Sequence, residues 1–162
     1  MRILFLAVAV FLLGGCAGRP LPKYEPPVAR APEMKVRTTA YTHTEADHRR
    51  YGARNALGTP LRHGDLNSAA ADWSRFPAGT VFRIRATGEI FEVDDYGWAL
   101  SGTNTIDLYK PSRRAMNEWG VRRVTIDILR WGDINESYRV LKPRSKHRHV
   151  RRMVRQIEQR YF

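Results

Sequence analysis

Alternation of apolar and polar residues dominates the middle of this chain. Residues 80–85 alternate cleanly, and a Thr-Gly-Glu turn joins them to a second apolar run at 90–93, which together predict a hairpin of two strands. Residues 123–129 alternate in the same way. Residues 36–42 and 106–109 are rich in β-branched and aromatic side chains, which favours two further strands.

The remaining patterns between 36 and 132 predict one buried strand and one short helix. Residues 69–71 are three alanines, and a strand is predicted there because Asp72 and the following Pro-Ala-Gly break the run at once. A helix is predicted within 111–120, with Ser112 as N-cap and Gly120 as the residue that ends it. At least five short strands and one helix indicate an all-β fold, a small barrel rather than a parallel α/β sheet.

The C-terminal extension, residues 133–162, has a different pattern. Residues 142–162 hold eight Lys or Arg, two His and one acid. Five apolar residues there recur at helical spacing, which predicts a basic amphipathic helix; they are Val150, Met153, Val154, Ile157 and Tyr161. Two interpretations stay open: a membrane-surface or wall-polymer anchor, or a helix that packs its stripe on the barrel.

The first fifteen residues have the layout of a secretory signal. A positive start is followed by an unbroken apolar run at 3–13, too short for a spanning helix of about 20 residues. The ending Leu-Gly-Gly-Cys-Ala resembles a bacterial lipoprotein signal, in which Cys16 becomes the lipidated first residue. Cys16 is the only cysteine, so no disulfide forms within the chain and lipidation explains its placement. The alternative is an ordinary signal with an incidental cysteine.

Residues 16–35 follow as a proline-rich segment, with five prolines between 17 and 35. Such a composition favours an extended tether with little secondary structure. On the lipoprotein interpretation, this tether holds the domain at 36–132 off a membrane.

The net charge narrows the choice of partners. The chain has 28 Lys and Arg against 16 Asp and Glu, and loss of residues 1–15 removes only Arg2, which leaves 27 against 16 and a net charge of +11. In a secreted protein this charge favours an anionic lipid surface or cell-wall polymer, and no nucleic acid is expected as partner. Ala17 after the cysteine resembles the outer-membrane sorting pattern of lipoproteins, so the expected location is the periplasmic face of the outer membrane, with the lipid on Cys16 in that membrane.

Two carboxylates stand at the ends of a glycine-containing loop between apolar runs. Asp107 lies between Ile106 and Leu108, where an acid needs partners or a retained proton. Burial or a second carboxylate raises an aspartate pKa, and both causes are expected for Asp107 if Asp95 lies near it. These two residues are therefore the candidate catalytic pair.

The long polar loop after residue 42 holds two histidines, a residue type that often binds metal ions. His43 and His48, with Asp47, match no standard ligand spacing, which favours solvated loop residues. Asp94, Asp127 and Asp133 are likewise expected to be solvated surface acids.

Several motifs in chain order match one known family. They are Thr39-Ala40-Tyr41-Thr42, Ala70-Ala71-Asp72 with Pro77-Ala78-Gly79-Thr80, Asp95-Tyr96-Gly97-Trp98-Ala99-Leu100-Ser101-Gly102, Ile106-Asp107-Leu108-Tyr109 and Trp119-Gly120-Val121-Arg122-Arg123-Val124. Together they resemble the 3D domain, named for three aspartates, whose fold is a six-stranded double-psi β-barrel. The domain occurs in membrane-bound lytic transglycosylase A and in small cell-wall proteins.

The resemblance implies peptidoglycan glycan strands as substrate. Asp107 then protonates the oxygen between N-acetylmuramic acid and N-acetylglucosamine, and as a base accepts the proton of the muramic C6 hydroxyl, which gives a 1,6-anhydro product. Asp95, with the backbone of Gly97, orients Asp107 or pairs with it electrostatically. Asp72 is the first of the three aspartates; it is counted with the substrate-binding residues, although capping of the turn before Pro77 is the simpler role. No metal and no other cofactor is implied.

Three aromatic residues complete the expected sugar site. Tyr41, Tyr96 and Trp98 are candidate stacking surfaces beside Gly97. Tyr96 and Trp98 depart from the family pattern, which has threonine and glycine there, and the loop to Asp107 is one residue longer. The chain also lacks the large domain that frames the sugar groove in the transglycosylase.

Two other functions stay open on the same barrel. One is a non-catalytic peptidoglycan-binding or scaffolding lipoprotein. The other is a hydrolase with the two aspartates as paired acid and base.

Overall fold

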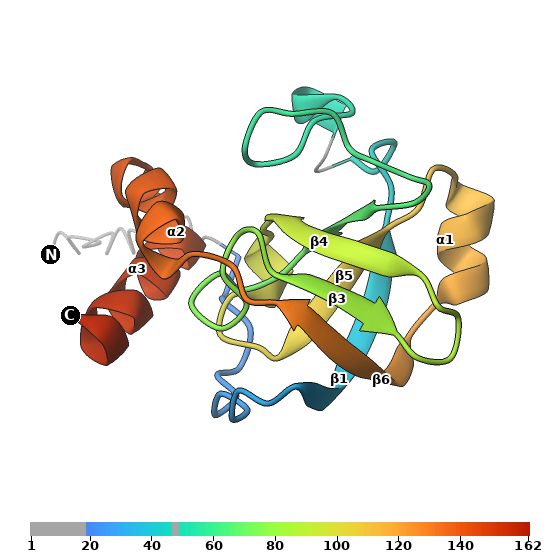
Figure 1. Cartoon of the computed structure of the whole chain (residues 1–162). Helices are drawn as coiled ribbons and strands as arrows, with labels where there is room; N and C mark the ends of the chain where they lie inside the picture. Colours follow the sequence, from blue (N-terminus) through green and yellow to red (C-terminus); the bar gives the residue numbers. More distant parts are fainter. Residues whose placement is uncertain (1–18, 47–48) are drawn as a thin grey trace, which may run out of the picture.

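A computed structural model describes residues 19–46 and 49–162, with the side chain of residue 50 left out (Figure 1). The expected signal segment at 1–15, the lipidation site Cys16, and the loop residues Asp47 and His48 lie outside the described residues.

The described chain forms a closed barrel of six strands in the order β1-β5-β2-β4-β3-β6 (Figure 1). The strands are β1 (Glu33–Tyr41), β2 (Asn67–Ala70), β3 (Val81–Ile84), β4 (Ile90–Asp95), β5 (Thr105–Tyr109) and β6 (Arg122–Arg130). The pairs β1–β5 and β2–β4 are parallel, and the other four are antiparallel. The predicted six-stranded barrel is confirmed as a mixed barrel.

Helices lie at opposite ends of this barrel (Figure 1). The α-helices are α1 (Arg113–Trp119), α2 (Ile134–Leu141) and α3 (Arg148–Tyr161), and the short 3-10 helices are η1 (Arg49–Tyr51), η2 (Trp98–Leu100) and η3 (Lys142–Arg144). The expectation of an all-β fold with one short helix and one C-terminal helix missed α2. Its apolar residues alone show no long repeat, and it packs beside α3.

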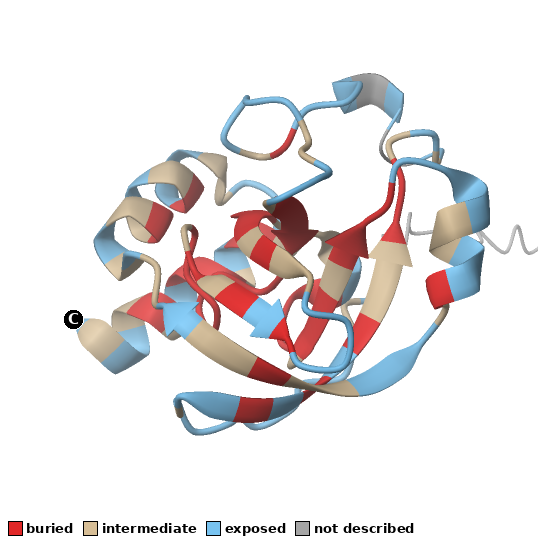
Figure 2. Cartoon of the chain, turned by 45° about the vertical axis from the view of Figure 1, so that its right-hand side comes forward, coloured by how far each residue is buried: buried red, intermediate tan, exposed pale blue. Residues whose placement is uncertain are grey.

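The core lies inside the barrel, and Figure 2 shows buried residues gathered along its strands. Phe82 and Phe91 stack across the β3–β4 hairpin with ring centroids 5.6 Å apart. Other fully buried side chains come from every layer of the domain: Trp73, Phe76, Ile84, Val93, Ile106, Leu108, Ile126, Leu141, Met153 and Ile157. Burial of this apolar surface is the main stabilising contribution.

The N-terminal boundary of the barrel differs from the expected one. β1 begins at Glu33 rather than 36, because Met34 is buried and pairs with Ile126 of β6. Residues 19–32 have no regular secondary structure, as expected, yet they lie against the domain. The Glu25 N–H donates to the Gly102 carbonyl over 2.8 Å, so this part of the expected tether is fastened to the barrel.

Both predicted caps of α1 are confirmed. The Ser112 side chain accepts a hydrogen bond from the Ala115 N–H, and Gly120 ends the helix with φ of 61°. Asp133 caps α2 by accepting hydrogen bonds from two backbone N–H groups, a structural role that its description as a solvated acid did not include. Asp127 lies at the surface as expected and pairs with Arg85.

The C-terminal helix is confirmed, and its apolar stripe is buried. Val150, Met153, Val154 and Ile157 all join the main core. The side-chain amide of Gln156 lies 2.9 Å from the Ser74 hydroxyl oxygen, a contact that fixes the helix to the loop after β2. The stripe therefore packs on the domain, the second of the two interpretations. Over the described ranges, no helix combines the length and apolar character that crossing a membrane requires.

Candidate functional site

A β-bulge brings the acids of β4 to the outer face of the barrel. Ala69 pairs with Val93 whereas Ala70 pairs with Asp95, so the ladder skips Asp94. Without the bulge, Asp95 would alternate onto the core side. The bulge thus sets two consecutive acids beside Ala70.

Ala70 also pairs with Asp107 on its other side, in β5. Asp95 and Asp107 therefore flank one small residue, with backbones roughly 10 Å apart, two strand spacings. The alanine methyl leaves room between the two acidic side chains. The predicted candidate pair is brought to one face of one sheet.

Asp107 is only partly buried, because strand alternation sends it outward. Ile106 and Leu108 are both fully buried in the core, and Asp107 points to the opposite face. The Thr39 hydroxyl, directly across in β1, donates to Asp107 Oδ1 over 2.6 Å. The expectation that its two apolar neighbours bury Asp107 is wrong.

Asp95 is the more buried of the two acids, with 8% of its surface exposed. Oδ1 accepts the Tyr96 N–H over 2.9 Å, and Oδ2 lies 3.4 Å from the Tyr41 hydroxyl that donates to it. Burial, reinforced by the charge of Asp94, raises the pKa of Asp95 to about 7, in spite of these hydrogen bonds. Asp95 therefore exchanges a proton near neutral pH.

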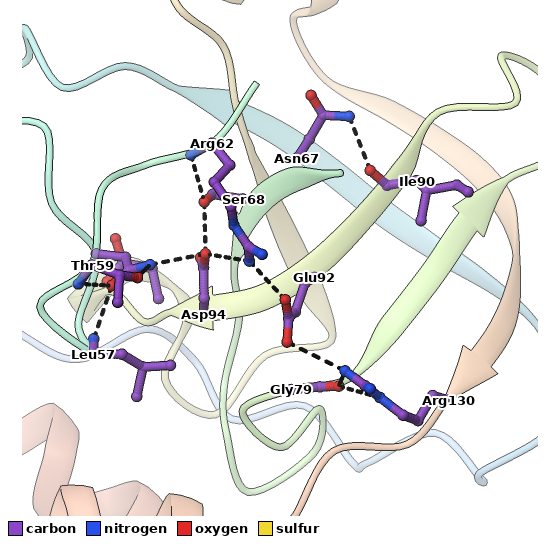
Figure 3. Close-up of polar contacts among 12 residues, drawn as sticks. Leu57, Thr59, Arg62, Asn67, Ser68, Gly79, Ile90, Glu92, Asp94 and Arg130 are labelled. Atoms are coloured by element: carbon purple, nitrogen blue, oxygen red, sulfur yellow. Dashed lines mark hydrogen bonds and ion pairs between the residues drawn. The ribbon is translucent and has the colours of Figure 1, made fainter. Parts of the chain in front are cut away.

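Asp94 is not the solvated acid that the sequence suggested. Only 2% of it is exposed, and Oδ2 accepts hydrogen bonds from Ser68 (2.6 Å) and Arg62 (3.0 Å) (Figure 3). Arg62 also pairs with Glu92 over 2.7 Å, so one guanidinium bridges two acids of β4. Burial raises the pKa of Asp94 even so. The acid is a structural anchor.

The loop after β1 covers Asp95 and is held at two points. Asn55 donates to Asp94 Oδ2 over 2.9 Å, and the Ala56 carbonyl accepts from Arg144 over 2.9 Å. The Ala56 N–H in turn hydrogen bonds to Asp95 and lowers its pKa. The burial of Asp95 thus depends on contacts from both the loop and η3.

Tyr41 is a buried part of the site rather than an open stacking surface. Its ring packs against Tyr109 with centroids 5.6 Å apart. Burial first, then the charges of Asp95, Asp94 and Asp107, raise the pKa of its phenol well above the usual value. The Tyr41 hydroxyl is therefore a neutral donor between the two candidate acids.

Two polar residues of this site, His43 and Thr39, were not predicted from the sequence. The Tyr109 hydroxyl lies 2.8 Å from His43 Nδ1, so His43 is tied to the site and not simply solvated. Thr39 belongs to the motif at residues 39–42, but the sequence predicted no role for its side chain. Its position two residues before Tyr41 places both on one strand face, a signal that alternation could have supplied.

The predicted aromatic residues of the 96–98 loop are also engaged. Tyr96 packs edge-on against Trp73, and its hydroxyl accepts a hydrogen bond from Arg144 over 3.3 Å. The Arg19 guanidinium stands 3.9 Å from the centre of the Trp98 ring. Gly97 precedes η2 as its N-cap. One face of Trp98 is thus covered by the N-terminal segment.

Asp72 is fully buried and holds two loops together. It accepts hydrogen bonds from the Ser74 N–H and hydroxyl, at 2.8 and 2.6 Å, and from the Gly102 N–H at 2.6 Å. Gly102 has φ of 79°, which lets its N–H face the carboxylate. Burial raises the pKa of Asp72. Asp72 offers no surface to a ligand, so the simpler structural role expected for it is the one it has.

Within 19–46 and 49–162, no cluster of three or more His, Cys, Asp or Glu side chains could hold a metal ion. Comparison with protein-family models gives no match to the chain, and comparison with curated proteins gives none either. The geometry of the site is therefore the basis for assigning function.

Proposed function

We propose that this protein is a lipid-anchored peptidoglycan lytic transglycosylase of the 3D-domain type, with Asp107 as the catalytic acid and base. The observation that carries the proposal is the pairing of a partly exposed Asp107, hydrogen bonded to Thr39, with the buried Asp95 across Ala70. One acid can reach a glycan, and the other changes its charge near neutral pH.

The chemistry follows from these positions. Asp107 donates its proton to the leaving glycosidic oxygen as the anomeric carbon gains positive charge, and then takes the proton of the C6 hydroxyl that closes the anhydro ring. Thr39 fixes the rotamer of Asp107 through its hydroxyl. Ionised Asp95 adds negative charge that stabilises an oxocarbenium ion between the two acids, while neutral Asp95 does not.

The fold class proposed with this function is the double-psi barrel. Two parallel pairs, β1–β5 and β2–β4, within a closed six-stranded barrel support it. The arginines of the basic C-terminal helix would face an anionic wall polymer, because its apolar stripe is already buried. We place the protein at the periplasmic face of the outer membrane, anchored through Cys16, on the sequence pattern alone.

The test is the identity of the products released from purified sacculi. We expect anhydro-muropeptides, which mass spectrometry separates from reducing-end products by the mass of one water. Reducing ends would instead assign a hydrolase with Asp95 and Asp107 as its acid and base.

A second candidate, a non-catalytic peptidoglycan-binding lipoprotein, is favoured by one observation. Tyr41 and Tyr96 are packed into the domain, and Trp98 has Arg19 on its ring. These contacts reduce the aromatic surface that is available for stacking against the sugars of a glycan. Capture of the protein by sacculi without product, unchanged by Asp107→Asn, would support this candidate.

A further inference from the structure

A pocket with a volume of about 340 Å³ lies among segments that are far apart in the sequence. Its lining residues are Pro27, Val28, Arg30, Met34, Arg75, Phe76, Trp131, Arg160 and Tyr161. The lining holds three arginines and no acid, and it shares no residue with the candidate active site. Such a charge imbalance favours an anionic ligand.

Within the part of the chain that the structure describes, only one of the three arginines forms an ion pair. Arg75 is 4% exposed and stands 3.8 Å from Asp72 as a buried ion pair. Among the described residues, neither Arg30 nor Arg160 forms an ion pair. The pocket therefore carries about two uncompensated positive charges, which a carboxylate would partly neutralise.

Arg30 is held over the pocket by aromatic rings. Its guanidinium lies 4.6 Å from the Trp131 ring centre and 5.4 Å from that of Tyr161. Trp131 is itself stacked on Phe76, with planes 16° apart. A cation–π contact does not use the N–H groups of a guanidinium, and within the described chain Arg30 donates no hydrogen bond, so an N–H edge stays available. That edge matches the fork of a carboxylate.

Arg160 supplies a second donor group on the same pocket. One of its N–H groups donates to the Ser74 carbonyl over 3.3 Å, which positions the side chain from the end of α3. Apolar contact is available beside the arginines from Val28, Met34 and Phe76. The pocket thus combines two carboxylate-binding groups with a surface for an apolar or ring portion.

We propose that this pocket binds a carboxylate-bearing sugar. Its volume lies at the small end of the range for ligand sites, roughly 300–1,000 Å³, which suits a single sugar or little more. On the proposed function, on which this choice of sugar rests, the carboxylated unit of the glycan is N-acetylmuramic acid with its lactyl group. The pocket would hold the strand at a point separate from Asp107.

Two sugars that differ mainly in the lactyl carboxylate test this directly. Free N-acetylmuramic acid is titrated into the full protein, and the Trp131 indole N–H is followed by NMR, assigned with Trp131→Phe. We expect this signal to shift with N-acetylmuramic acid and to stay unchanged with N-acetylglucosamine at the same concentration. Equal shifts with both sugars would overturn the proposal, as would inorganic phosphate acting at lower concentration than the sugar acid.

Variants separate this pocket from the active site. Arg30→Gln should weaken N-acetylmuramic acid roughly tenfold or more, because it removes a charged hydrogen-bond donor. Arg83→Gln, at an exposed position on β3, is the matched control and should bind as the unmodified protein does. Asp107→Asn should also bind normally, so loss of catalysis leaves this result intact. Equal weakening by the Arg30 and Arg83 variants, or loss of the Trp131 shift in Asp107→Asn, contradicts the assignment.

Discussion

Thr39 and Asp107 face each other in the parallel β1–β5 pair, with the threonine hydroxyl donating to the carboxylate over 2.6 Å. Thr39→Val keeps the shape and removes the donor. A hydrogen bond to a charged group contributes about 1.5–3 kcal/mol, so release of anhydro-muropeptides should fall about tenfold or more. Thr125→Val on β6, whose hydroxyl has no role in this site, is the control. Equal activity of the two variants would show that Thr39 does not position Asp107.

Asp95 gives the folded protein a pH-dependent contribution to stability. Its pKa rises from 3.8 to about 7 on folding, so the folded state holds its proton more tightly than the unfolded state. The contribution of Asp95 to the free energy of unfolding is fully present below about pH 4 and is lost as the pH rises to about 7. The upper limit of this contribution is about 4 kcal/mol. Asp95→Asn removes this dependence while keeping a similar shape.

Urea unfolding at about pH 4 and about pH 8 measures this effect. The free energy of unfolding of Asp95→Asn, minus that of the unmodified protein, should be larger at the higher pH. A difference for Asp95→Asn that is constant with pH would contradict the assigned burial.

Removal of the Asp72 carboxylate is expected to destabilise the fold strongly. Asp72→Ala leaves the buried Arg75 without its ion partner and the Gly102 N–H without an acceptor, at a cost of about 3–5 kcal/mol. Asp127→Ala removes only an exposed pair with Arg85 and should cost less than about 1 kcal/mol. Thermal or denaturant unfolding compares the two. Similar small losses would mean that Asp72 is not structural.

The buried stripe of α3 makes the C-terminal helix part of the domain. Ile157→Ala should destabilise the protein by about 2–5 kcal/mol, because its side chain is fully buried in the core. Arg155→Ala, on the exposed side of the same helix, should lie within about 0.5 kcal/mol of the unmodified protein. An unaffected Ile157→Ala variant would instead favour a helix that detaches from the barrel.

Much of the barrel could be predicted because alternation and helix caps can be recognised within short stretches of the sequence. Alternation in β3 marks Phe82 and Ile84 as buried, and Ser112 and Gly120 mark the ends of α1. α2 could not be predicted in the same way. Its single fully buried apolar residue, Leu141, gains its environment from α3.

The two candidate acids could be proposed from the sequence, but their surroundings could not. Asp95 and Asp107 flank Ala70 from the two neighbouring strands, but the bulge that turns Asp95 outward depends on how β2 pairs with β4. The burial of Asp94 depends on Arg62 and Asn55, which are 32 and 39 residues away in the chain. Tertiary contacts of this range leave no local pattern in the sequence.

Asp107 as the catalytic acid is the central claim, and one comparison tests it most directly. Sacculi are digested with the unmodified protein, with Asp107→Asn and with Asp127→Asn, and anhydro-muropeptides are quantified by mass spectrometry. We predict product from the unmodified protein and from Asp127→Asn, and a loss of about 10²–10⁴-fold for Asp107→Asn, the range that acid catalysis contributes. Equal amounts of anhydro product from Asp107→Asn and the unmodified protein would contradict the claim.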